Sequence, residues 1–226
     1  MIISIINGSP RSKGATGTIL TEMKNYLEKK DDVTVNYIDL SKLNMKFCNG
    51  CIHCYKTGTC LIKDDDIEKV AAMVKASDGI IIGSPTYGSN ISGMLKNFID
   101  RGHFILEQAL RNKKGFALST YGIADGHQVV KILKKLFLVS GGSRAGDMRV
   151  KIDFNNNPLL IEHMVKKIHK KMDVLYAAIK FQKSKSLFER FFNELLLVKV
   201  IWKPIFLKNR AKYAGILNAW EQMGIL

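Results

Sequence analysis

The four cysteines of the chain are its sharpest chemical feature, because all of them lie within 13 residues. They are Cys48, Cys51, Cys54 and Cys60, and the other residues of the 226-residue sequence include no cysteine. Thiolates this close together can surround one metal centre, and sulfur ligands favour iron–sulfur clusters or zinc. Tetrahedral zinc sites usually use two separated Cys-x-x-Cys pairs, so a single compact run favours an iron–sulfur cluster. Zinc and metal-free thiols stay open as alternatives.

A second candidate site is the hydroxyl-rich segment 8–16, Gly-Ser-Pro-Arg-Ser-Lys-Gly-Ala-Thr, which leads from a predicted strand into a predicted helix. Backbone N–H groups and the dipole at a helix N-terminus favour an anion. The hydroxyls of Ser9, Ser12 and Thr16 and the guanidinium of Arg11 can bind phosphate oxygens. The segment matches neither the P-loop nor the Gly-x-Gly-x-x-Gly motif. A plain strand-to-helix turn with a capping serine is the alternative interpretation.

Two further loops, 84–90 and 119–126, are also rich in Gly, Ser and Thr. Tyr87 can stack on an aromatic ring, and the backbone amides from Thr86 to Gly88 can reach ring heteroatoms. The alternative for Tyr87 is a packing residue at a turn. Together with segment 8–16, these loops predict a phosphate cradle and two walls of a pocket for a flat ring.

Apolar runs that alternate with segments of helical spacing predict the elements that position these loops. Strands are predicted over Met1–Asn7, Val33–Ile38, Gly79–Gly83, Gly115–Ser119 and Asp147–Ile152, and helices over 15–29, 67–74, 91–99, 127–139 and 159–179. Strands that alternate with helices predict an α/β fold with a parallel sheet covered on both faces. In such a sheet, ligands bind at the carboxyl ends of the strands.

Three motifs in order resemble the flavodoxin-like NAD(P)H-dependent FMN reductases over about residues 1–180: Gly8-Ser-Pro-Arg11, Ser84-Pro-Thr-Tyr-Gly88 and Lys96…Asp100-Arg101. The resemblance implies a flavodoxin-like, doubly wound five-stranded sheet in the order 2-1-3-4-5, with a domain over residues 1–182. It also implies FMN as cofactor and NAD(P)H as co-substrate. The cysteine spacing, within an insert over residues 48–60, is similar to that of the iron–sulfur flavoprotein branch. This similarity implies that the four cysteines hold a [4Fe-4S] cluster beside FMN.

The resemblance assigns the site residues as well. The FMN phosphate would be held by Ser9, Arg11, Ser12, Gly14, Ala15 and Thr16. The ring and ribityl chain would be flanked by Ser84, Pro85, Thr86, Tyr87, Gly88, Ser119, Thr120, Tyr121 and Gly122. Ala15 departs from the family pattern, in which asparagine is usual, so one side-chain contact is lost. No catalytic protein residue is expected, because FMN carries the chemistry and passes electrons to a cluster or to a small acceptor such as a quinone.

The net charge of +15 is unevenly distributed along the chain. Residues 1–110 hold 13 Lys and Arg against 12 Asp and Glu, whereas residues 111–226 hold 22 against 8. No zinc-finger, basic-zipper or aromatic RNA-binding signature accompanies the basic half, so no nucleic-acid partner is expected. The sequence has neither a signal peptide nor an uncharged apolar stretch of ~18 residues, which predicts a cytoplasmic protein without disulfides.

Residues 183–226 form a predicted helical extension, with an apolar helix over 187–198, a break near Pro204 and a helical tail around Trp220. The extension must bury its apolar surface against the domain, a second subunit or a membrane. We expect an oligomer contact in a homodimer or homotetramer; membrane binding by the basic segment 180–213 is the less favoured alternative. The alternative function is an electron-transfer module that a ferredoxin-like carrier reduces, without nicotinamide turnover.

Overall fold

A five-stranded parallel sheet forms the centre of the computed structural model, which describes residues 1–153, 156–182 and 184–226. The strands are β1 (Ile2–Asn7), β2 (Thr34–Asp39), β3 (Gly79–Pro85), β4 (Lys114–Tyr121) and β5 (Ser143–Lys151). Their order is β2-β1-β3-β4-β5, so the predicted fold class and strand order are confirmed. β5 begins at Ser143, earlier than predicted, because its polar first residues pair with β4 across a bulge.

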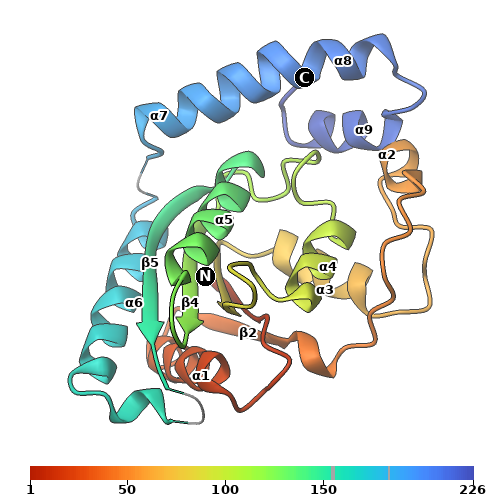
Figure 1. The fold of residues 1–226 in the computed structure, drawn as a ribbon. Coiled ribbons are helices and arrows are strands. Elements are labelled where there is room, and N and C mark those ends of the chain that lie inside the picture. The colour runs from red at the N-terminus through yellow and green to blue at the C-terminus, as the bar shows by residue number, and fades with distance from the viewer. Residues whose placement is uncertain (154–155, 183) are drawn as a thin grey trace.

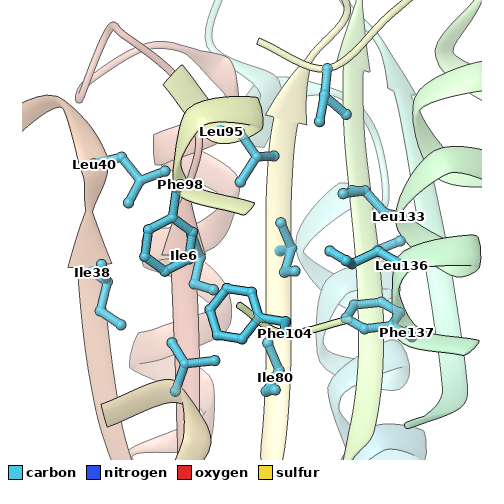
Figure 2. Close-up of a cluster of buried hydrophobic side chains, with 14 of the residues drawn as sticks. Ile6, Ile38, Leu40, Ile80, Leu95, Phe98, Phe104, Leu133, Leu136 and Phe137 are labelled. Atoms are coloured by element: carbon cyan, nitrogen blue, oxygen red, sulfur yellow. The ribbon is translucent and has the colours of Figure 1, made fainter. Parts of the chain in front are cut away.

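Helices cover both faces of the sheet (Figure 1). α1 (Ala15–Leu27) and α6 (Met164–Lys180) pack on one face, and α3 (Ile67–Lys75), α4 (Gly93–Arg101) and α5 (Gly126–Val139) pack on the other. Ile5 of β1 belongs to the first apolar cluster, and its neighbour Ile6 belongs to the second, which Figure 2 shows. Burial on both faces explains why the strands are almost continuously apolar. α6 begins at Met164 instead of Leu159, because a 3₁₀ turn, η2 (Pro158–Leu160), precedes it.

The three loops predicted to form a site leave β1, β3 and β4, which are neighbours in the sheet. Ser84 and Pro85 pair with Ser119 and Thr120, so the last residues of β3 and β4 already belong to the predicted loops. Parallel strands end at the same edge of a sheet, and the three loops therefore start side by side.

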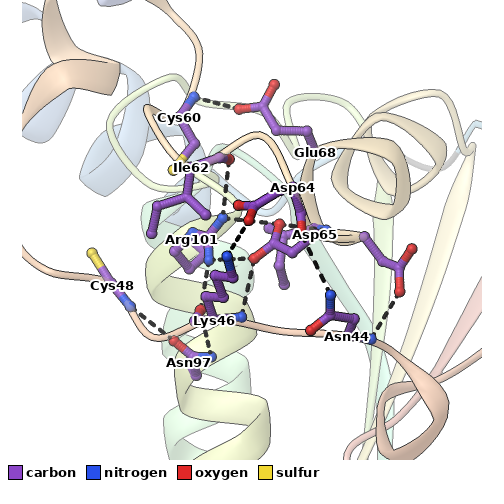
Figure 3. A network of polar contacts seen from close by, with 12 residues as sticks. Asn44, Lys46, Cys48, Cys60, Ile62, Asp64, Asp65, Glu68, Asn97 and Arg101 are labelled. Carbon is purple, nitrogen blue, oxygen red and sulfur yellow. Dashed lines mark hydrogen bonds and ion pairs between the residues drawn. The ribbon is translucent and has the colours of Figure 1, made fainter.

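The cysteine insert, defined here as residues 44–66, follows the 3₁₀ turn η1 (Leu40–Lys42) and ends where α3 begins. It contains α2 (His53–Thr57), a five-residue helix that is too short to show a helical period in the sequence. α4 anchors the insert through a network of polar contacts (Figure 3). Arg101 Nη1 donates to Asp65 Oδ2 at 2.7 Å and to the Lys46 carbonyl at 2.5 Å.

A second residue of α4, Asn97, fixes the start of the insert (Figure 3). Its Oδ1 accepts from the Cys48 N–H at 3.2 Å, and its Nδ2 donates to the Lys46 carbonyl at 3.2 Å. At the end of the insert, Asp66 Oδ2 accepts from the Asn44 N–H at 2.8 Å. The insert is therefore attached to the domain at both of its ends.

The extension begins as one continuous helical rod formed by α7 (Leu187–Glu189), the π-helix η3 (Arg190–Trp202) and α8 (Lys203–Lys208) (Figure 1). The predicted break near Pro204 is wrong. Trp202 and Lys203 keep right-handed helical dihedrals. Pro204 lies in the first turn of α8, where a missing N–H is well tolerated. Lys183, the first residue of the predicted extension, lies outside the described residues.

The last helix, α9 (Ala214–Gln222), covers the cysteine insert (Figure 1). Gly215 touches the end of α2 so closely that a Cβ there would lie 2.0 Å from the Gly58 nitrogen. Trp220 is fully buried, and its Nε1 donates to the Leu106 carbonyl at 2.8 Å. This end of the extension thus buries its apolar surface against its own domain. Among the described residues, no helix is long and apolar enough to cross a membrane.

The Arg101–Asp65 pair predicts a large stability difference between two neighbouring aspartates. Both side chains of the pair are almost fully buried, at 1% and 0% exposed, so Asp65→Asn leaves a buried cation without its carboxylate. We expect a loss of about 3 to 5 kcal/mol in the free energy of unfolding, measured by urea denaturation. Asp64→Asn is the control: Asp64 is 72% exposed in its pair with Lys46, so its loss should change stability little.

The same pair predicts that the free energy of unfolding depends on pH in the acid range. Burial opposes ionisation of Asp65, but hydrogen bonds from Arg101, Lys46 and Ile67 hold the pKa of its carboxyl below the ordinary value of 3.8. Its contribution to stability is therefore complete above pH 3.8 and declines as the pH falls through the lower folded pKa. Equal destabilisation by Asp64→Asn and Asp65→Asn at neutral pH would contradict this account.

Candidate functional site

A cavity of about 840 Å³ lies at the carboxyl edge of the sheet, within the size range of small-ligand sites. Eleven of the fifteen residues predicted for the cofactor line it: Ser9, Arg11, Gly14, Ala15, Thr16, Pro85, Thr86, Tyr87, Thr120, Tyr121 and Gly122. The structure thus brings together residues from all three predicted loops.

The first loop is closed by its own hydroxyl groups. Ser9 Oγ accepts from the Arg11 N–H and donates to the Arg11 carbonyl, both at 3.1 Å. The Thr16 and Thr120 hydroxyls form a hydrogen bond of 2.7 Å, which joins the first turn of α1 to the end of β4. Two of the three predicted phosphate-binding hydroxyls therefore also set the shape of the loop.

The N-terminus of α1 is open towards the cavity. Gly14 is the N-cap and provides no side-chain acceptor for the first-turn N–H groups. The loop folds back over this turn so closely that a Cβ on Gly17 would lie 1.9 Å from the Ser12 carbonyl oxygen. Arg11 and Lys13 are exposed and line the same cavity. Uncapped N–H groups beside two cations form a cradle for an anion.

The second loop is a tight turn whose amides are partly engaged. The Thr86 N–H donates to the Thr120 carbonyl at 2.8 Å, and the Tyr87 N–H donates to the Asn90 carbonyl at 3.0 Å. Two of the amides that were expected to reach a ring, those of Thr86 and Tyr87, therefore already have partners within the chain. Gly88 has a φ of +52°, which favours glycine. The Tyr87 side chain is 46% exposed at the cavity wall.

Four predicted residues do not line the cavity: Ser12, Ser84, Gly88 and Ser119. Ser12 Oγ pairs with Ser41 Oγ at 2.8 Å. The buried Ser84 hydroxyl donates to the Pro85 carbonyl at 2.8 Å, and that of Ser119 pairs with Thr86 Oγ1 at 3.1 Å. These three hydroxyls support the wall from behind.

One side of the cavity was not predicted from the sequence. Its additional lining residues are Lys13, Thr18, Ile152, Asp153, Asn156 and Asn157. The last four follow β5, which lies beside β4, so this loop reaches the same edge as the others. Its polar residues directly after the last predicted strand were the available signal.

The four cysteines do not form a ready metal site. Cys48 and Cys51 are exposed, Cys54 is half-buried and Cys60 is buried. Across residues 1–153, 156–182 and 184–226, no three His, Cys, Asp or Glu side chains are close enough to hold a metal ion. Their donor chemistry fits an iron–sulfur cluster, but their arrangement in this structure does not.

His103, a half-buried histidine that was not predicted as a site residue, lies beside the insert. Burial disfavours the charged imidazole of His103, but hydrogen bonds to Cys54 and Glu107 outweigh it and raise the pKa of His103 to about 10. The Nδ1 atom lies 3.4 Å from Glu107 Oε1. A cationic ring therefore lies next to one of the four thiols.

Comparisons with known proteins find relatives of this chain. An iron-sulfur flavoprotein of Clostridioides difficile is 38% identical to the chain over an alignment of 229 residues, which covers 100% of each sequence. An iron-sulfur flavoprotein of Methanocaldococcus jannaschii is 34% identical over 149 residues, covering 61% of this chain and 74% of the relative.

Solved structures show the same fold. An apo NADH:FMN oxidoreductase aligns with a TM-score of 0.61 at 18% identity, covering 84% of this chain and 93% of that one. A flavodoxin from the domain Archaea aligns with a TM-score of 0.53 at 14% identity, covering 80% and 99%. The sequence model described as NADPH-dependent FMN reductase matches residues 1–157. The chain belongs to the NADPH-dependent FMN reductase family.

Proposed function

We propose that this chain is an FMN-dependent oxidoreductase that oxidises NAD(P)H and delivers electrons to a small acceptor. The carrying observation is the uncapped N-terminus of α1, which opens beside Arg11 and Lys13 on a cavity of about 840 Å³. An FMN phosphate fits this cradle, and the walls formed by β3 and β4 suit a flat ring. Bound FMN accepts a hydride and releases electrons, singly or in pairs.

The protein's part in this chemistry is to bind and orient. The first-turn N–H groups of α1 and the charge of Arg11 would hold the phosphate. The Thr16–Thr120 hydrogen bond keeps the cradle at a constant distance from the β4 wall. Ser89 Oγ donates to Asp125 Oδ2 at 2.5 Å, so the loops after β3 and β4 hold each other in place at the rim.

Flavin binding tests the cradle. We expect apoprotein to bind FMN at least about tenfold more tightly than riboflavin, because only FMN has the phosphate. Gly17→Ala forces the Ser12 carbonyl away from α1 and should abolish most of this preference while changing riboflavin binding little. Gly93→Ala is the control, since a Cβ there meets nothing within 4 Å. Fluorescence titration gives the affinities.

Anaerobic mixing of the FMN-loaded protein with NADH or NADPH tests the reaction. Bleaching of the flavin absorbance is expected with at least one nicotinamide. An FMN-loaded protein that neither nicotinamide bleaches at millimolar concentration contradicts the reductase. That result would favour the electron-transfer module, for which the basic half of the chain offers a docking surface to an acidic carrier.

We also propose that Cys48, Cys51, Cys54 and Cys60 bind an iron–sulfur cluster. Their spacing and the name of the relative that is 38% identical over the full chain support this proposal. Binding requires the insert to close around the metal, because the thiols are apart in this structure. Residues 49–52 are neither helix nor strand and lie beyond the contacts of α4 with Lys46 and Cys48, so this part of the insert can rearrange without breaking an element.

Metal analysis after anaerobic reconstitution tests the cysteines. We expect about four iron and four sulfide per chain in the parent protein, and a loss of most iron in Cys51→Ser. His53→Ala, in the same run, should retain the iron. One zinc per chain, or no bound metal, would contradict the cluster.

The rod of the extension supports our proposal that the chain forms a homo-oligomer. The first part of the rod exposes Leu187 at 84%, Phe188 at 59%, Phe191 at 58% and Leu195 at 46%. Exposed apolar side chains that gather on one helix mark interaction surfaces. The inner side contacts the chain's own domain through buried Asn193, whose Nδ2 donates to the Leu138 carbonyl at 2.9 Å.

Light scattering tests this contact. The double variant Phe188→Glu/Phe191→Glu should lower the measured mass to that of a monomer, because it places four carboxylates into a twofold contact. Leu160→Glu, at a residue 82% exposed outside the extension, should leave the mass unchanged. A monomeric parent protein that binds anionic vesicles would instead identify the apolar face as a membrane contact.

A further inference from the structure

A second large cavity, of about 620 Å³, lies at the opposite edge of the sheet, where β1, β3 and β4 begin. We call it the basic pocket, because five lining residues are cations and one is a carboxylate. The cations are Arg111, Lys113, Lys114, Lys180 and Lys185, and the carboxylate is Asp78. All five cations come from the strongly basic part of the chain, residues 111–226.

The carboxylates around the pocket do not balance these cations. Lys180 Nζ lies 3.3 Å from Asp32 Oδ2, and Lys185 Nζ lies 3.0 Å from Glu194 Oε1. Asp78 Oδ2 accepts from the backbone N–H of Ile2 at 2.7 Å. Glu189 also acts on Lys114, but it is paired with Arg144. Even when these four carboxylates are counted against the five cations, positive charge is in excess.

The two lysines at the start of β4 donate to neutral oxygens, and a carboxylate also acts on each of them, Asp78 on Lys113 and Glu189 on Lys114. Lys113 Nζ donates to the Ser77 carbonyl at 2.8 Å, and Lys114 Nζ donates to Ser143 Oγ at 3.0 Å. Burial lowers the pKa of both amines, because it disfavours their charged form. An anion that enters the pocket would offset this cost of desolvation.

We propose that the basic pocket binds an oligophosphate group, either as free pyrophosphate or as part of a nucleoside diphosphate. A diphosphate has several negative charges close together, which matches cations supplied by residues 111–114, α6 and the start of the extension. The volume lies within the range of small-ligand sites. Because the strands are parallel, this pocket is separated from the FMN cavity by the length of the sheet.

Calorimetric titration of pyrophosphate and of ADP tests the proposal, with excess FMN present to occupy the phosphate cradle of α1. We expect saturable binding of one ligand per chain. Lys113→Gln should weaken it at least about tenfold, and Lys113→Arg should restore most of the affinity. Lys166→Gln, an exposed position of α6 with the same loss of charge, should change affinity less than about twofold.

The affinities of ADP and pyrophosphate together show whether the pocket binds a nucleotide or the diphosphate group alone. Tighter binding of ADP indicates a nucleotide site, and equal binding indicates a site for the diphosphate alone. Absence of saturable binding by both ligands, or equal weakening by Lys113→Gln and Lys166→Gln, would overturn the proposal. Thermal denaturation of each variant confirms that it is folded. The Lys113 dependence is expected with or without FMN, so this outcome is independent of the proposed flavin chemistry.

Discussion

The parallel pairing of β1 with both β2 and β3 is the constraint on which the functional edge of the molecule depends. The chain leaves β1 towards β2 on one side and reaches β3 on the other. Connections that diverge from neighbouring strands leave a crevice at their carboxyl ends. α1 starts directly in this crevice, so its uncapped N–H groups meet the walls formed after β3 and β4. The cavity at this edge of the sheet is thus a consequence of strand order.

Helix α4, which packs on the opposite face of the sheet from α1, holds the cysteine insert. α4 reaches the insert through Asn97 and Arg101, and α9 covers α2 from the other side. A buried ion pair contributes little net stability compared with apolar packing, but it is intolerant of losing one partner. Arg101 and Asp65 therefore act as a specific attachment between the domain and the insert. Cys54 lies in α2, whereas Cys48, Cys51 and Cys60 lie in irregular parts of the insert.

Part of the excess positive charge of the chain lies at the opposite edge of the sheet, where β1, β3 and β4 begin. Lys113 directly precedes the buried strand β4 and Lys114 is its first residue, so the sheet places both side chains in the pocket. The first half of the chain, which includes the phosphate loop and the cysteines, is nearly neutral. The sheet thus separates a flavin edge from a basic edge, and the two can take different ligands.

The strand order came from the resemblance of three motifs to the FMN reductases. The sequence alone determined the fold class and most of the residues that line the cavity at the carboxyl edge of the sheet. These properties rest on local patterns: apolar runs for buried strands, helical spacing for the covering helices, and Gly, Ser and Thr at strand ends. It also placed the four thiols in one insert. Such patterns can be recognised in the sequence because each strand and the loop that follows it are contiguous in the chain.

Only the tertiary structure decided which distant residues meet. The pairing of Arg101 with Asp65, the contact of Gly215 with Gly58 and the hydrogen bond of Trp220 to Leu106 join segments that lie far apart in sequence. The wall contributed by Asn156 and Asn157 depends on β5 lying next to β4. The rod continues through Pro204, which lies in the first turn of α8. None of these contacts leaves a periodic signal, because long-range packing selects them from many sterically equivalent partners.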